Sequence, residues 1–246
     1  MGNGLDRSSA ASVDVLRWGR ERARTGTWRG DRTVAFLAPV PDAPLPSAAF
    51  LRRCLATLAE RGFTRVVTGA LSPLEQTGFL AVGFDVEEHL HLLGVDLAHG
   101  VGPVPPGHRL VRGGGSRRAA VLAIDRAAFD TFWQFDERGL GDAINATPHA
   151  RFRIALAEDD TVVGYAICGR AGTRGFVQRL AVDPRRQREG TGRRLLLDGL
   201  RWMRRHGVRR AVVNTQIGND PALALYRAVG FTDEPVGLSV LSAGLA

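Results

Sequence analysis

The residues best suited to chemistry are those of Gln187-Arg-Glu-Gly-Thr-Gly192, which join a predicted strand ending at Val182 to a predicted helix. Two glycines remove side chains where the backbone would approach a ligand, and they leave free N–H groups at the start of the helix. Those donors and the positive end of the helix dipole suit a pyrophosphate. A plain turn with a glycine N-cap is the other interpretation. A dinucleotide site is disfavoured, because the third glycine of that fingerprint is missing and no acidic residue ends the next strand.

The charge of the chain gathers around this loop. All 33 basic residues are Arg, and against 25 acidic residues they give a net charge of +8. Residues 1–105 are neutral, with 11 Arg and 11 acidic residues, so the whole excess lies in residues 106–246. Ten Arg fall between Arg185 and Arg210, which indicates either an element that attracts anions or a solvated helix face. A nucleic-acid surface is disfavoured, because a charge run on a helix usually faces solvent.

Composition excludes several classes of protein. Without lysine, the chain cannot form a Walker-type phosphate loop, a pyridoxal Schiff base or a protein-kinase ATP site. Cys54 and Cys168 are too few for a zinc site, so we expect no metal and two buried free thiols in a reducing compartment. No apolar run approaches the length of a membrane span, and residues 1–10 lack a signal-peptide pattern. We therefore expect a cytoplasmic globular protein that has no membrane partner.

The elements that must position the loop form a mixed pattern. A helix is expected over residues 116–146, with Ser116 as its cap. Three stretches then alternate like strands joined by hairpin turns, namely 152–157, 162–168 and 176–182. Four elements follow, namely a helix at 190–206, a strand at 210–216, a helix at 221–229 and a strand at 236–242. Strands that begin as a meander and then alternate with helices imply an α/β (mixed α+β) fold with a mixed sheet.

An internal repeat spans the Gly/Pro-rich segment 99–107. The match at an offset of 145 residues is between Phe50-Leu-Arg-Arg-Cys-Leu-Ala-Thr-Leu-Ala-Glu-Arg-Gly62 and Leu195-Leu-Leu-Asp-Gly-Leu-Arg-Trp-Met-Arg-Arg-His-Gly207. Both stretches have apolar residues on one helix face, and both end at a glycine. Gly78-Phe-Leu-Ala-Val-Gly-Phe84 matches Leu225-Tyr-Arg-Ala-Val-Gly-Phe231 at an offset of 147. Several matches in the same order indicate a duplicated unit.

The two copies differ where chemistry is expected. In place of the glycine-containing loop, the first copy has Asp42-Ala-Pro-Leu-Pro-Ser47, and Phe79 stands where the second copy has Tyr226. The predicted domains are therefore residues 1–98, which lack the anion-binding loop, a linker at 99–107, and residues 108–246, which carry the site. The first copy is expected to be a structural partner.

Two motifs of the second copy resemble signatures of the GNAT superfamily of N-acetyltransferases. Residues 187–192 are similar to its Q/R-x-x-G-x-G/A motif, and Asn219-Asp-Pro-Ala-Leu-Ala-Leu-Tyr-Arg-Ala-Val-Gly-Phe231 resembles N-x-x-A-x-x-L-Y-x-x-x-G-F. The resemblance covers residues 108–246 and, in degenerate form, residues 12–98, and the layout is similar to that of mycothiol synthases. It implies tandem GNAT-like domains with a central mixed β-sheet flanked by helices.

What the resemblance implies is acetyl-CoA bound in a cleft between the strand that ends at Val182 and the strand 210–216. Backbone amides of the loop would hold the pyrophosphate, and backbone groups of Leu180 and Val182 would pair with the pantetheine arm. The Val182 amide would polarise the thioester carbonyl, and Asn219 would contact the pantetheine arm or cap the next helix. The expected cofactor-binding residues are Leu180, Ala181, Val182, Gln187, Arg188, Gly190, Thr191, Gly192, Arg193 and Asn219.

Acetyl transfer also needs a donor that protonates the departing thiolate. The resemblance assigns this role to Tyr226, whose phenol is protonated at neutral pH because its reference pKa is about 10. Core packing is the usual role of a tyrosine on an amphipathic helix, but the resemblance and Phe79 in the first copy favour the catalytic role.

The general base is not identified by the sequence. Many relatives have a Glu on the strand before the loop, but residues 176–182 contain no carboxylate. A water chain or an amine that arrives deprotonated would also serve. The aromatic segment 129–137 would either line an acceptor pocket or pack as a core helix. The candidate bases and acceptor contacts are Asp136, Glu137, Asp142, His149, Asn214 and Gln216.

The predicted function is an acetyl-CoA-dependent N-acetyltransferase that acts on the amine of a small molecule or a protein, by direct attack in a ternary complex. The alternative is a non-catalytic acyl-CoA-binding module or sensor, because the strand carboxylate is missing. The expected partners are acetyl-CoA and an amine acceptor. A second copy of the chain is a further candidate partner, in a homodimer.

Overall fold

The computed structural model describes residues 14–41 and 43–245, which divide into two compact units. Unit 1 comprises the described residues up to His89 together with those from Leu238 onward, and unit 2 comprises Leu90–Gly237. These boundaries differ from the predicted domains, 1–98 and 108–246. The difference arises because the last strand pairs within unit 1, and because the segment before residue 108 packs within unit 2.

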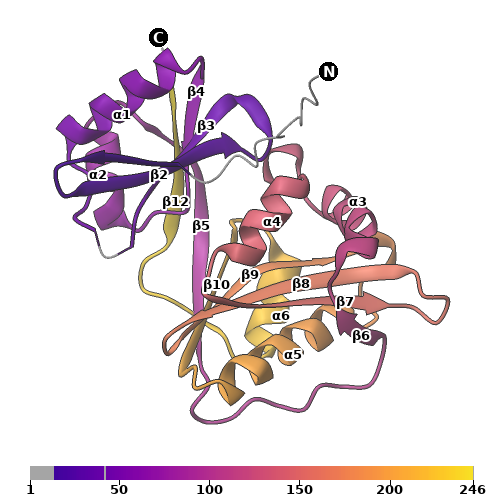
Figure 1. Ribbon diagram of the computed structural model, residues 1–246. Helices are drawn as coiled ribbons and strands as arrows, with labels where there is room; N and C mark the ends of the chain where they lie inside the picture. Colours follow the sequence, from indigo (N-terminus) through magenta and orange to yellow (C-terminus); the bar gives the residue numbers. More distant parts are fainter. Residues whose placement is uncertain (1–13, 42, 246) are drawn as a thin grey trace, which may run out of the picture. The chain divides into compact units, whose positions relative to one another are not determined.

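Unit 1 is a sheet with two helices on one face (Figure 1). Its strands lie in the order β1-β2-β3-β4-β12, and the first part of β5 lies beside β12. Strands β3 and β4 are parallel, whereas β12 is antiparallel to β4. The elements are β1 (Asp14–Trp18), β2 (Glu21–Trp28), β3 (Asp31–Pro39), α1 (Ala48–Glu60), β4 (Arg65–Thr68), α2 (Pro73–Leu80), β5 (Asp85–Asp96) and β12 (Leu238–Gly244).

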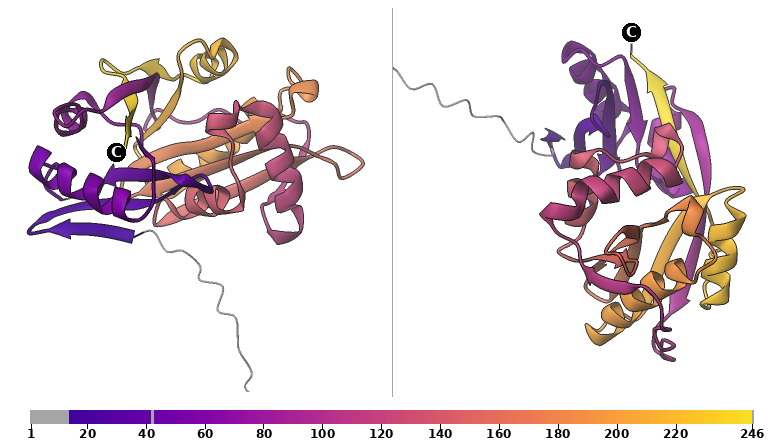
Figure 2. Two further views of the ribbon diagram at one scale, coloured as in Figure 1. Left: turned by 90° about the horizontal axis from the view of Figure 1, so that it is seen from above. Right: turned by 90° about the vertical axis from the view of Figure 1, so that its right-hand side faces the viewer.

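Unit 2 is a sheet in the order β5-β10-β9-β8-β7-β6, with β9 and β10 parallel and the other neighbours antiparallel. Helices α3 and α4 cover one face and α5 covers the other, as Figure 2 shows. The elements are β6 (Arg109–Arg112), α3 (Arg118–Ala128), α4 (Glu137–Asn145), β7 (His149–Leu156), β8 (Val162–Ala171), β9 (Arg174–Val182), α5 (Thr191–Arg205), β10 (Arg210–Gln216), α6 (Asp220–Ala228) and β11 (Thr232–Asp233).

The duplicated pattern predicted from the sequence is confirmed in the order strand, helix, strand, helix. Helices α1 and α5 are both followed by a left-handed glycine, Gly62 (φ 86°) and Gly207 (φ 82°). Each unit is completed by a strand from the other half of the sequence, because β5 pairs with β10 and β12 pairs with β4. In this tandem arrangement, the two halves of the sequence therefore exchange a strand: β5 of the first half pairs in unit 2, and β12 of the second half pairs in unit 1.

The predicted helix over 116–146 is wrong in its extent and in its cap. Residue Ser116 lies in a short 3₁₀ turn, and α3 has no side-chain cap. Helix α3 ends where Phe129 is extended (φ −129°, ψ 150°), and α4 begins only after Asp136, whose carboxylate accepts a hydrogen bond from the Gly139 N–H at 2.6 Å. Residues 129–135 therefore form a strap between the two α-helices, with one short 3₁₀ turn at Thr131–Trp133.

A buried ion pair holds this strap in place. The fully buried Asp125 of α3 accepts two hydrogen bonds from Arg179 of β9, at 2.8 and 2.9 Å, and one from the Phe135 N–H at 2.6 Å. The hydroxyl of Tyr165 also donates to Asp125, and Arg179 donates to the Trp133 carbonyl at 2.6 Å. Burial raises the pKa of Tyr165 above its ordinary value, so this phenol remains a donor. The pair satisfies each charge while it folds the strap back onto the sheet.

Replacing Asp125→Asn should lower the free energy of unfolding by about 2–3 kcal/mol, because it removes the charge that Arg179 is buried against. Urea denaturation followed by circular dichroism measures this loss. The matched control is Asp130→Asn on the exposed side of the strap, which should stay within about 0.5 kcal/mol of the wild type. Equal stability of the two variants would contradict the role given to Asp125.

Candidate functional site

Strand β9 parts from β10 halfway along its length. The two strands pair only from Arg174 to Val177, opposite Arg210–Val213. At that point the register of β9 against β8 shifts, because Cys168 lies opposite Val177 whereas Ile167 lies opposite Arg179, which leaves Gln178 as an extra residue. Such a bulge bends a strand. The second part of β9, up to Val182, therefore has β8 on one side and no paired strand on the other among the described residues.

The open edge of β9 presents backbone donors. The N–H of Asp183 donates to the Val163 carbonyl of β8 at 2.9 Å. Because successive N–H groups of a strand point to opposite sides, those of Leu180 and Val182 point away from β8 and toward the open edge. An extended amide-containing ligand could add to this edge as a further strand.

The loop after β9 turns sharply into α5. Arg188 (φ 66°) and Gly190 (φ 79°) are both left-handed, and Gly190 is the N-cap of the helix. The helical ladder begins with the Arg194 N–H, which donates to the Gly190 carbonyl at 3.0 Å. The amides of the preceding turn consequently have no acceptor inside the helix. Together with the positive end of the helix dipole, they could bind an anionic ligand in front of the start of α5.

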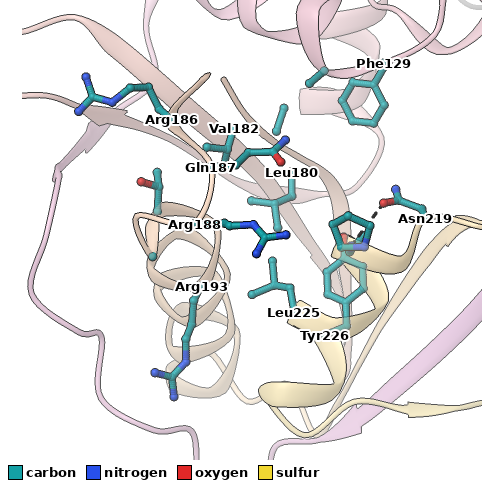
Figure 3. A pocket seen from close by; sticks show the side chains of 17 residues that line it. Phe129, Leu180, Val182, Arg186, Gln187, Arg188, Arg193, Asn219, Leu225 and Tyr226 are labelled. Carbon is teal, nitrogen blue, oxygen red and sulfur yellow. Dashed lines mark hydrogen bonds between the residues drawn. The ribbon is translucent and has the colours of Figure 1, made fainter. Parts of the chain in front are cut away.

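One cavity of about 410 Å³ joins these features between β9, the loop and α6 (Figure 3). All the residues predicted to bind the cofactor line it, and so does Tyr226. Phe129, from the aromatic segment that was expected to line an acceptor pocket or to pack in the core, also lines it, and the remaining lining residues, which were not predicted, are Ala128, Arg186, Pro221, Ala222 and Leu225.

The cavity is positively charged at the loop. Arg186, Arg188 and Arg193 line it, and Figure 3 shows Arg188 pointing into its centre while Arg193 points away. None of the lining residues found in the described chain is acidic. The nearby Glu189 is paired with Arg186 at 2.8 Å. An anionic ligand in the cavity would therefore meet the guanidinium group of Arg188, for which the described residues provide no acidic partner.

Other Arg of the dense run have internal partners. Arg194 donates to the carbonyls of His108, at 2.7 Å, and Pro105, and Arg201 lies 3.3 and 3.2 Å from the carbonyls of Val101 and Gly102. These contacts fasten the predicted linker along α5. The run thus divides among Arg that line the cavity, Arg that have internal partners, and the exposed Arg204, Arg205 and Arg209.

Tyr226 lies at the base of the cavity on α6. Its side chain is 6% exposed, and its ring packs against Phe231 with 5.7 Å between centroids. Burial raises the pKa of Tyr226 above its ordinary value, so the phenol remains protonated across the physiological range. Asn219 has the capping geometry, because its side-chain oxygen accepts a hydrogen bond from the Ala222 N–H at 3.3 Å, while it also lines the cavity.

Phe129 forms the wall of the cavity opposite the loop (Figure 3). The guanidinium carbon of Arg179 lies 3.4 Å from its ring centroid and 4.0 Å from that of Phe135, so the cation is held between two rings. Sequence reasoning missed Arg179 and Asp125 as the supports of this wall. Two signals in the sequence could have identified them, because Arg179 is a charged residue inside an apolar strand and Asp125 is an acid on the apolar face of a helix.

The candidate bases do not line this cavity. Asp136 caps α4, and Glu137 lies 3.5 Å from Arg118. Asp142 lies 4.0 Å from Arg138, and burial raises its pKa above the ordinary value. His149 is exposed at the start of β7. The two candidate acceptor contacts on β10, Asn214 and Gln216, also lie outside the lining.

The first copy has closed the corresponding space. Strand β4 pairs with β3 along its whole length, Arg65–Thr68 opposite Val34–Leu37, so no open edge remains there. Gly78, the counterpart of the cavity-lining Leu225, lies so close to the Pro46 carbonyl that a Cβ would not fit. The segment that replaces the loop therefore packs directly onto α2, although Asp42 itself lies outside the described residues.

Neither a metal site nor a membrane span is indicated by the part of the chain that the structure describes. Its His, Cys, Asp and Glu side chains form no group of three suited to a metal ion. None of its helices is both long enough and apolar enough to cross a membrane. Cys54 and Cys168 are buried free thiols, as predicted.

Comparison with known proteins gives three kinds of match. Residues 119–231 match the model of the acetyltransferase (GNAT) family. A mycothiol acetyltransferase of Saccharomonospora viridis is 35% identical over 133 residues, which cover 48% of this chain and 43% of that protein. The N-alpha-acetyltransferase RimI of Mycobacterium tuberculosis is 44% identical over 97 residues, which cover 38% of this chain and 58% of that protein. The chain thus spans about half the length of the curated relatives it matches.

Among solved structures, the fold is similar to a tandem GNAT protein from the clavulanic acid biosynthesis pathway, with a TM-score of 0.69 and 17% identity, covering 94% of this chain and 82% of that one. It is also similar to a GCN5-related N-acetyltransferase from Kribbella flavida, with a TM-score of 0.61, 15% identity and coverage of 94% and 89%. At these identities the likeness concerns the fold.

Proposed function

We propose that the chain is an acetyl-CoA-dependent N-acetyltransferase of the GNAT family, whose model its residues 119–231 match. The observation that carries the proposal is the single cavity in which the open edge of β9, the loop before α5 and the phenol of Tyr226 come together. A pyrophosphate, an extended amide chain and a reacting thioester would each find its partner along that one cavity.

The residues of unit 2 divide the work of binding. Amides at the start of α5, with Arg188 beside them, hold the phosphates. The N–H groups of Leu180 and Val182 hold the pantetheine arm as an added strand, and the Val182 N–H polarises the thioester carbonyl. Bound acetyl-CoA supplies an activated acetyl group. The wall formed by Phe129 closes the end of the cavity away from the phosphates.

Transfer then requires two proton movements. The nitrogen of the neutral amine forms a bond to the acetyl carbon while the carbon–sulfur bond breaks, and Tyr226 donates its proton to the departing sulfur. The acetylated nitrogen then releases its extra proton, and a proton passed through solvent restores the phenol of Tyr226. An acceptor that is protonated in solution must lose its ammonium proton before it can attack. Because the described lining contains no Asp, Glu or His, we infer that the acceptor reaches the cavity as the neutral amine.

This inference predicts how the rate depends on pH. With two acceptors whose ammonium pKa values differ by about two units, the rising limb of kcat/KM should move with the acceptor. A base on the protein would instead give one limb common to both acceptors. The measurement is kcat/KM for each amine at saturating acetyl-CoA from pH 6 to pH 10.

The function itself is tested by release of free CoA thiol with a panel of amines. The names of the two relatives suggest that the panel should contain both small-molecule amines and peptides with a free α-amine. We expect turnover with at least one class. Tight CoA binding without turnover on any amine would favour a non-catalytic acyl-CoA sensor.

We also propose that the first copy is a structural partner that binds no acetyl-CoA. The support is its closed strand pair and the Pro46 carbonyl against Gly78. One cofactor per chain is expected.

A further inference from the structure

A histidine outside the cavity contacts the loop from behind. His108 follows the predicted linker, and its side chain is 15% exposed. Its Nδ1 lies 2.8 Å from the Thr191 hydroxyl oxygen. Its Nε2 lies 3.4 Å from the Arg186 guanidinium and 3.5 Å from the Glu189 carboxylate. One ring therefore touches three residues of the loop and the helix start, although none of the steps above uses it.

The loop needs such a support because little else holds it. Residues 187–190 are all exposed, and they run between two buried residues, Asp183 and Thr191. Asp183 anchors the first end, since its carboxylate accepts a hydrogen bond from the Arg185 N–H at 3.0 Å. Thr191 is 3% exposed and packs toward Gly164 of β8. The only described partner of its hydroxyl is the His108 ring.

His108 is itself fixed by the helix that it supports. Its carbonyl accepts a hydrogen bond from Arg194, one turn beyond Thr191, at 2.7 Å. The side chain and the backbone of His108 thus both contact α5 near its start. The backbone of His108 is thus held beside the start of α5, which keeps its ring within reach of Thr191.

We propose that His108 is a positioning residue for the phosphate-binding loop, which it pre-organises by holding the Thr191 hydroxyl and the Arg186–Glu189 pair. The inference rests on the proposed function, because it gives the loop a cofactor to bind. A pre-organised loop binds more tightly, since less conformational freedom is lost on binding. The effect of His108 therefore falls on cofactor affinity and on KM for acetyl-CoA, while Tyr226 and the bond-making step keep their geometry.

The test compares variants of the full chain by calorimetric titration with CoA and by steady-state kinetics. His108→Ala should weaken CoA binding about tenfold, as expected for the loss of one ordered hydrogen bond and its neighbours, and should raise KM for acetyl-CoA by a similar factor with little change in kcat. Thr191→Val should act alike, and the double variant should be no worse than either single one.

Conservative variants separate positioning from general stability. His108→Asn keeps a polar group near the position of Nδ1, so it should retain most of the affinity. His206→Ala is the matched control, because His206 lies at the other end of α5 and bonds through Nδ1 to the Trp202 carbonyl at 2.8 Å. It should bind CoA like the wild type.

The outcomes distinguish this inference from the proposed function. If the wild type binds no CoA, both are overturned. If the wild type binds CoA and His108→Ala binds it equally well, only the role of His108 is overturned. If His108→Ala fails to fold, Thr191→Val and His108→Asn decide the question in its place, and additive losses in the Thr191 and His108 variants would overturn the proposal.

Discussion

Tyr226→Phe is expected to lower kcat for acetyl transfer about 10²–10³-fold, the range in which a general acid contributes. The substitution removes only the hydroxyl that faces the cavity. Packing should survive, because the first copy already carries the phenylalanine: Phe79 packs on Phe84 with 5.2 Å between centroids, as Tyr226 packs on Phe231. Stability and CoA affinity should therefore stay close to those of the wild type. Steady-state kinetics and a CoA titration on the same preparation measure both.

The pH dependence gives this prediction a second readout. Expulsion of the thiolate without a proton donor does not depend on the pH of the solution, so the variant gains nothing from a higher pH at this step. The deficit of Tyr226→Phe should consequently stay nearly constant between pH 7 and pH 10. The raised pKa of Tyr226 keeps its phenol protonated over that range. A kcat within twofold of the wild type at pH 7 would rule out the role of the phenol.

Gly192→Glu is expected to abolish CoA binding, with a loss of affinity of at least about 10³-fold. A Cβ at Gly192 would lie 3.2 Å from Leu225 Cδ2 and 3.6 Å from Val182 Cγ2, so the side chain would enter the cavity between β9 and α6. Its carboxylate would occupy the region proposed for the phosphates. The fold should persist, because a negative charge in the first turn of a helix is favourable to the dipole.

Calorimetry tests the prediction and its control together. The wild type should bind one equivalent of CoA, and Gly192→Glu should bind none. The matched control is Gly115→Glu, which adds the same charge near the start of α3, where a Cβ meets nothing within 4 Å. Gly190→Glu should also lose binding, but Gly190 is left-handed, so that variant adds backbone strain. An unchanged affinity of Gly192→Glu for CoA would contradict the proposal that the loop 187–192 binds the phosphates.

The two copies show how a shared pattern can keep a fold while losing a site. In both units, a helix that is followed by a left-handed glycine connects two parallel strands. In unit 2 the pairing of β9 and β10 ends at Val177, before the bulge, whereas in unit 1 the pairing continues to Leu37 near the end of β3. A shift of strand register thus decides whether an edge is left open for a ligand.

Much of the site could be predicted from the sequence because its parts are local. Gly190 and Gly192 shape the backbone of the first turn of α5, and Asn219 caps the first turn of α6. Each acts on backbone groups no more than one helical turn away. Tyr226 follows Asn219 by two helical turns, a spacing that places both along one short helix. The grouping of Arg near the loop was visible in the same way, although only three of the ten line the cavity.

The helix over 116–146 was mispredicted because its break depends on a distant partner. Nothing in the periodicity of that segment signals that Asp125 binds Arg179, which lies 54 residues later, and so draws the Phe135 N–H back toward α3. The domain boundaries differ for a similar reason. The pairing of β12 with β4 joins residues that are more than 170 positions apart.

By itself, the sequence determined the order of the elements, the duplicated pattern, the loop suited to a pyrophosphate and the presence of the loop and the phenol in the second copy alone. The tertiary structure decided that these parts share one cavity, that Phe129 closes it, that His108 supports the loop and that the closing strands are exchanged. The physical reason is the range of the interactions. Turns and caps are set by neighbouring residues, whereas strand register, buried ion pairs and the closing of a cavity depend on which distant segments pack together.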